Sequence, residues 1–91
     1  MNQEKKGKFI LEKREEKNLT RAELAEKLGV NEKLVSNLEN AKCKLDLSLF
    51  KPLCEILDIT INELISGKKI KKEDYQEEFE KNIIDLIDYY F

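Results

Sequence analysis

The feature that most constrains the fold is a pair of short helical segments joined by a tight turn, in Leu19–Lys42 (LTRAELAEKLGVNEKLVSNLENAK). Thr20 precedes the first segment with Glu23 three residues later, the pattern of a capping box at a helix start. Gly29 suits the left-handed end of that helix, and Asn31 can cap the next one. The buried faces are predicted to be Leu24, Ala25 and Leu28, then Leu34, Val35 and Leu38. The stretch therefore predicts two short crossed helices.

The rest of the chain also has helical patterns. Further helices are predicted over Lys5–Lys17, from Ser48 along LSLFKPLCEILDI, and from Thr60 to Gly67. Ser48 is expected to cap the second of these because Pro52 must lie in the first turn of a helix. The inward residues of that segment are expected to be Leu53, Ile56 and Leu57. One proline and three glycines in 91 residues favour an all-α chain with one small core.

The C-terminal part, residues 68–91, is predicted to be a separate element after a domain over residues 1–67. A basic connector, KKIKK, leads into an amphipathic helix whose apolar residues recur every three or four positions: Tyr75, Phe79, Ile83, Leu86 and Tyr90. Such a stripe needs a surface to cover it. Three arrangements remain open: packing on its own domain, pairing with a second chain as a homodimer, or fraying.

The distribution of charge bears on whether this chain could bind DNA. The chain carries 17 basic and 19 acidic side chains, a net charge of −2. Residues 1–70 hold 14 basic and 12 acidic side chains, net +2, whereas residues 71–91 hold 3 and 7, net −4. The acidity thus belongs mostly to the C-terminal part, and the remainder allows local basic clusters.

Several function classes find no support in the residues. Two cysteines and no histidine cannot form a disulfide framework or a tetrahedral zinc site within one chain, so both thiols are expected to be reduced, Cys54 inward and Cys43 in a loop. No nucleophile with an adjacent base and no glycine-rich phosphate loop is present, so we expect no enzyme and no cofactor. The N-terminus lacks an apolar signal region and no run is long enough to span a membrane, which favours a cytoplasmic protein.

The segments LTRAELAEKLGV, VSNLEN and ILDITINELISG together resemble the Xre-like helix-turn-helix regulators typified by phage Cro and repressor proteins. The resemblance spans about Gly7 to Gly67. It implies a five-helix, lambda-repressor-like DNA-binding domain followed by the C-terminal amphipathic helix. In that family the second helix of the motif enters the major groove and the first crosses the phosphate backbone.

The resemblance also implies roles for individual residues. Glu32, Lys33 and Asn37 would occupy the base-reading positions, where a carboxylate, an ammonium and an amide each have a matching base edge. Arg14 and Glu39 would form a structural ion pair between the first and third helices. The positions that contact the DNA backbone would be Thr20, Arg21, Asn31, Ser36, Asn40, Lys42 and Lys44.

This sequence departs from the family pattern at several positions. Arg21 replaces a usual glutamine, and Ala41 replaces a usual glycine at a turn where the family suggests a positive φ. Leu45 stands where proline is common. Lys6 and Lys13 replace usual apolar residues on the core face of the first helix.

The sequence predicts a bacterial or phage-type transcriptional regulator, a repressor that binds double-stranded operator DNA as a homodimer through the helix Asn31–Asn40. The alternative is a protein-interaction module of the same fold, such as an antitoxin or adaptor.

Overall fold

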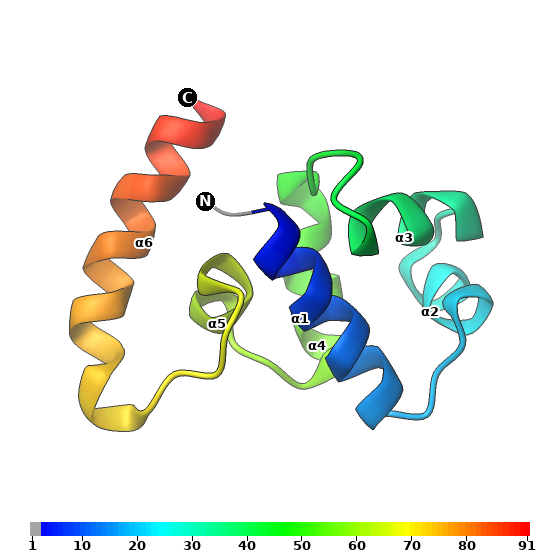
Figure 1. Cartoon of the computed structure of the whole chain (residues 1–91), viewed down its shortest axis with the longest axis horizontal. Coiled ribbons are helices and arrows are strands. Elements are labelled where there is room, and N and C mark those ends of the chain that lie inside the picture. Colours follow the sequence, from blue (N-terminus) through cyan, green and yellow to red (C-terminus); the bar gives the residue numbers. More distant parts are fainter. Residues whose placement is uncertain (1–2) are drawn as a thin grey trace.

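The computed structural model describes residues 3–91, apart from the side chain of Lys72, and this part of the chain is helical without strands. Its α-helices are α1 (Gln3–Glu16), α2 (Arg21–Leu28), α3 (Glu32–Glu39), α4 (Phe50–Leu57), α5 (Ile61–Ser66) and α6 (Tyr75–Tyr90). Two short 3₁₀ turns, η1 (Leu47–Leu49) and η2 (Lys72–Asp74), precede α4 and α6. Helices α2 and α3 lie at one end of the molecule and α6 at the other, with α1, α4 and α5 between them (Figure 1). We call α1–α5 the body.

Most of the predicted helix ends are confirmed. Both capping boxes are present, at Thr20 with Glu23 and at Thr60 with Glu63. Gly29 and Gly67 end their helices with φ of 73° and 68°, the left-handed conformation that favours glycine. The first helix begins two residues earlier than predicted and ends one residue earlier, at Glu16.

The predicted cap at Ser48 is wrong. Asp46 caps the preceding turn η1 instead, where its carboxylate accepts hydrogen bonds from the Ser48 backbone N–H and hydroxyl, both at 2.9 Å, and α4 itself has no side-chain cap. These bonds lower the pKa of the Asp46 carboxyl, because they favour its charged form. A 3₁₀ turn therefore precedes α4, which begins at Phe50. Pro52 still lies in the first turn of α4, as predicted.

Side chains from all five helices of the body and from the α3–η1 loop form one core. Leu24, Ala25, Val35, Leu38, Leu53 and Leu57 are buried as predicted, whereas Leu28, Leu34 and Ile56 are half-buried against the core. The fully buried residues include Ile10, Leu45 and Leu64. Gly7 lets α1 approach the end of α3, because a Cβ there would lie 2.6 Å from the carbonyl oxygen of Glu39.

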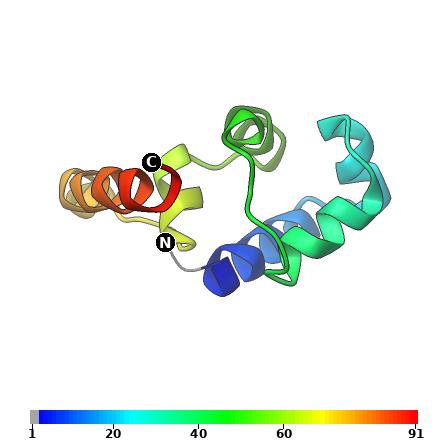
Figure 2. The same cartoon turned by 90° about the horizontal axis from the view of Figure 1, so that it is seen from above.

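Helix α6 packs against α5 of its own chain, as the first of the three arrangements expects (Figures 1 and 2). This packing covers only part of the predicted apolar stripe. Leu86 and Tyr90 lie against the core, whereas Tyr75, Phe79 and Ile83 stay about 40% exposed. In residues 3–91, no helix, α6 included, combines the length and apolarity needed to cross a membrane.

Candidate nucleic-acid interface

Helices α2 and α3 form a compact unit whose crossing is locked by small and apolar residues. Ala25 is buried where the helices meet, and Val35 and Leu38 fix α3 against the rest of the body. The backbone N–H of Val30 donates to the carbonyl of Ala25 at 3.0 Å, which closes the turn around Gly29. The pair stands at one end of the molecule (Figure 1), so a face of α3 is left uncovered.

The uncovered face of α3 carries the three predicted base-reading residues. At 100° per residue, Glu32, Lys33 and Asn37 fall on one side of the helix, opposite Val35 and Leu38. Glu32 and Lys33 are exposed and Asn37 is half-buried. Within residues 3–91, none of the three side chains takes part in a hydrogen bond or ion pair. Their polar groups are therefore available to a ligand.

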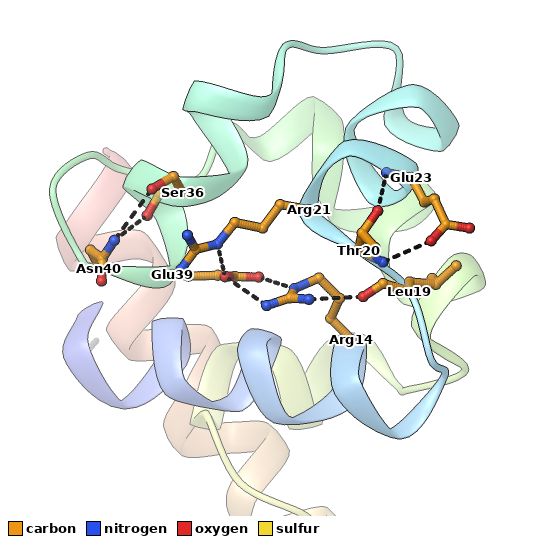
Figure 3. Close-up of polar contacts among 8 residues, drawn as sticks. All are labelled: Arg14, Leu19, Thr20, Arg21, Glu23, Ser36, Glu39 and Asn40. Carbon is orange, nitrogen blue, oxygen red and sulfur yellow. Dashed lines mark hydrogen bonds and ion pairs between the residues drawn. The ribbon is translucent and has the colours of Figure 1, made fainter.

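A buried carboxylate orients α3 relative to α1 and α2. Glu39 is 1% exposed at its side chain and pairs with Arg14, Nε to Oε2 at 2.6 Å, which confirms the predicted ion pair. Arg21 also donates to Glu39, from Nε to Oε1 at 2.9 Å. Figure 3 shows the carboxylate between the two guanidinium groups. Arg14 further donates to the carbonyl of Leu19 at 2.8 Å, which ties the α1–α2 loop to the same cluster.

The match to known families agrees with this geometry. A helix-turn-helix family model matches residues 10–64, more than half of the chain and most of the body. The chain belongs to the Cro/C1-type helix-turn-helix family. No curated protein gives a significant match. The family consists of DNA-binding regulators of transcription, typically without catalytic activity, and this chain is a DNA-binding helix-turn-helix protein in that sense.

Several residues of this helix-turn-helix protein that are predicted to contact the DNA backbone also serve as helix caps. The Thr20 hydroxyl accepts from the N–H of Glu23 at 3.1 Å, and the bonds from Thr20 lower the pKa of the Glu23 carboxyl. The Asn31 side chain accepts from the N–H of Leu34 at 2.8 Å. Asn40 donates to the carbonyl of Ser36 at 2.9 Å (Figure 3). Thr20, Asn31 and Asn40 remain exposed, so the caps hold these groups in fixed positions at the surface.

The predicted role of Arg21 needs one addition. Its pairing with Glu39 is not among the predictions, since Arg21 stands where the family usually has glutamine and no local pattern indicates a second arginine at this carboxylate. The Nε group is used by Glu39, whereas the terminal amino groups of Arg21 make no hydrogen bond within residues 3–91. Arg21 can therefore position α3 and still offer donors to a phosphate.

The loop after α3 of the helix-turn-helix motif carries Lys42 and Lys44, the last two residues that are predicted to contact the DNA backbone. It begins at Ala41, whose φ of 58° confirms the predicted positive value. Lys42 and Lys44 are both exposed. The Lys44 ammonium lies 4.6 Å from the centroid of the Tyr89 ring of α6. This contact could not be predicted from sequence patterns, because the two residues are far apart in the chain.

Proposed function

We propose that this protein is a sequence-specific repressor that reads an operator with α3 and binds it as a homodimer. The observation that carries the proposal is the outward face of α3, where Glu32, Lys33 and Asn37 present polar groups with no partner in residues 3–91. A carboxylate can accept from cytosine, an ammonium can donate to guanine, and an amide can pair with adenine. Capped helix ends and Lys42 add donors for the DNA backbone on either side.

A row of exposed apolar residues along α6, continued by Phe91 just after it, supports the homodimer. Tyr75, Phe79 and Ile83 continue at the same four-residue spacing to Ile87 and Phe91, and the five side chains are 40% to 88% exposed. We call these five residues the outer row. Several exposed apolar side chains on one helix are typical of surfaces that contact another protein. Two linked protomers would place two reading helices on half-sites about 34 Å apart.

The outer row also favours the interaction-module alternative. The row lies on a helix with five acidic residues and one lysine between Tyr75 and Tyr90, which suits a protein partner. The two functions differ in what they require of α3: an adaptor or antitoxin does not need the α3 side chains for its partner, whereas a repressor does.

Selection of bound duplexes from random DNA tests the proposal. We expect recovered sites with two related half-sites. Asn37→Ala should then cost about 1–3 kcal/mol on the selected duplex and little on random DNA. Lys42→Ala should weaken both and flatten the slope of log affinity against log salt by about 0.9 per protomer. Lys69→Ala, which removes an exposed lysine from the connector before α6, is the matched control and should change neither.

The homodimer has its own test. Phe79→Asp combined with Ile83→Asp should give monomers in sedimentation and weaker binding to the selected duplex, because a single reading helix contacts one half-site. A dimer that survives both changes would place the interface elsewhere. Failure to recover any DNA would favour the interaction module.

A further inference from the structure

The end of α6 holds the loop that follows the reading helix. The Tyr90 hydroxyl donates a hydrogen bond to the backbone carbonyl of Leu45, which is fully buried. The Tyr90 ring packs edge-on against Phe50, with centroids 6.1 Å apart. Burial is the main cause that raises the pKa of the Tyr90 hydroxyl to about 12, so it stays a donor at neutral pH. The loop backbone and the last turn of α6 are thus joined directly.

The neighbouring ring contacts a lysine of the proposed DNA surface. Tyr89 lies 4.6 Å from the Lys44 ammonium, a cation–π distance. A lysine held in this way has a preferred position next to α6. It must give up that position, at least in part, to reach a phosphate on the side of α3.

The charge of α6 also disfavours DNA binding. Residues 75–90 carry five acidic side chains and one lysine, a net charge of −4. Asp88 lies in the last turn, where the helix dipole adds partial negative charge. The last two turns of α6 carry Asp85 and Asp88 and no basic residue, so the helix end next to the loop with Lys42 and Lys44 repels the phosphates of DNA.

A buried cation opposes the docking of α6. Lys6 is 3% exposed, and its ammonium has no hydrogen-bond partner within residues 3–91. It lies 5.8 Å from the Tyr89 ring centroid and 5.9 Å from that of Phe50. Contact with the two rings offsets part of the hydration energy that the ammonium loses. A buried charge without a partner still opposes the packing that buries it. Release of α6 would let water reach this ammonium.

We propose that α6 is an intramolecular competitor of DNA: its docked end withholds Lys44 and the α3–η1 loop from the phosphate backbone, and DNA binding and α6 docking oppose each other. This inference rests on the proposed operator binding. It assigns the C-terminal helix a regulatory role on the same surface, separate from the outer row that would join two protomers.

The test compares two substitutions of one ring. Tyr89→Ala removes the ring, whereas Tyr89→Phe keeps it and serves as the matched control. Tyr89→Ala should raise affinity for the selected duplex and for a random-sequence duplex about two- to fivefold, since a cation–π contact of ordinary strength is lost. The freed lysine should also steepen the salt slope by up to about 0.9 per protomer. Tyr89→Phe should bind like the parent protein.

A second measurement uses the unaltered protein. Because coupling between two equilibria is reciprocal, saturating DNA should speed amide hydrogen exchange in the last two turns of α6. Circular dichroism checks that Tyr89→Ala is folded. If it is not, Tyr90→Phe, which removes only the bond to the Leu45 carbonyl, replaces it and should raise affinity by a smaller factor.

The outcomes separate this inference from the proposed function. Parent protein that binds DNA, with Tyr89→Ala no tighter and α6 exchange unchanged or slowed by DNA, overturns the competitor and leaves operator binding intact. Binding by Tyr89→Ala but not by the parent supports the competitor most strongly. If neither protein binds any duplex at low salt, operator binding and the competitor fail together.

Discussion

The packing inside the body differs from the packing of α6 against it in how polar and apolar residues are arranged. In the body, apolar side chains of α1–α5 point inward and most charges point out, with the Glu39 cluster and Lys6 as buried exceptions. Helix α6 places only Leu86 and Tyr90 against the core and adds a buried amide. Asn82 is 3% exposed and donates to the carbonyl of Asn62 at 3.0 Å and to the Ser66 hydroxyl at 2.6 Å. Four of the eight apolar residues of α6, Tyr75, Phe79, Ile83 and Ile87, are exposed and belong to the outer row.

This difference has a physical consequence. Apolar burial stabilises in proportion to area and tolerates small shifts, whereas buried hydrogen bonds fix one position and contribute about 1 kcal/mol each. Helix α6 should therefore have a defined position but a low free energy of opening, as expected of a segment that is released or exchanged in function.

The largest effect is expected in the body, at Glu39. Glu39→Ala should lower the free energy of unfolding by about 3–5 kcal/mol, because two arginines lose their shared buried carboxylate. Urea denaturation measures the change. Asp58→Asn is the control: Asp58 pairs with Lys17 at 3.7 Å, both side chains are exposed, and the loss should stay within about 0.5 kcal/mol. Equal losses in the two variants would mean that the buried cluster is not what holds α3.

The next effect lies where body and α6 meet, at Lys6. Burial lowers the pKa of Lys6 from 10.5 to about 8. The folded protein therefore loses this proton at lower pH than the unfolded chain, and its stability rises from about pH 8 to pH 10.5 relative to a protein without the group. Lys6→Met should be more stable than the parent by up to about 3 kcal/mol at pH 7, with a gap that narrows above pH 8.

Denaturation at several pH values checks the Lys6 prediction. Lys8→Met is the control, because Lys8 is exposed on the same helix. A constant gap between Lys6→Met and the parent from pH 7 to pH 10 would show that the ammonium is not buried in solution.

A smaller effect is expected within α6, at Asn82. Asn82→Ala leaves the Asn62 carbonyl and the Ser66 hydroxyl without this partner, at a cost of about 1–2 kcal/mol. The loss should appear as faster amide exchange in α6, with protection in α1–α3 unchanged. Lys81→Ala, at the exposed neighbouring position, should leave exchange as it is. Faster exchange throughout the body would show that α6 and the body unfold as one unit.

The sequence predicted best the features that depend on a few adjacent residues. The capping boxes at Thr20 and Thr60 and the end of α2 at Gly29 follow from local hydrogen bonding and backbone sterics, which act over one helical turn. Ser48 shows the limit of such rules: Asp46 lies two residues away and is also a good cap, and spacing alone does not decide between them.

Features that depend on distant contacts could not be predicted. Periodicity indicated one stripe on α6, but which arc of that helix meets the body depends on the fit of Asn82 against Asn62. At the candidate site, resemblance supplied the Arg14–Glu39 pair, and the second arginine at Glu39 emerged only from the fold. Lys6 was recognised as unusual in its position, yet nothing in the sequence placed Tyr89 above it.

The smallest effect concerns Ala41, at the start of the loop to which the end of α6 is hydrogen-bonded. Its φ of 58° is a conformation in which a Cβ is strained, and glycine adopts it freely. Ala41→Gly should raise the free energy of unfolding by up to about 1 kcal/mol, a rise in Tm of up to about 6 °C, after the greater freedom of glycine in the unfolded chain is subtracted. Ala22→Gly, the same change at an exposed position in α2, should instead destabilise by about 0.5–1 kcal/mol. Calorimetry gives both values. Because the strain belongs to the body, amide exchange in α6 should not change. A lower Tm for Ala41→Gly would show that the loop conformation is not strained. Faster amide exchange in α6 would show that the contact between α6 and the loop depends on that conformation.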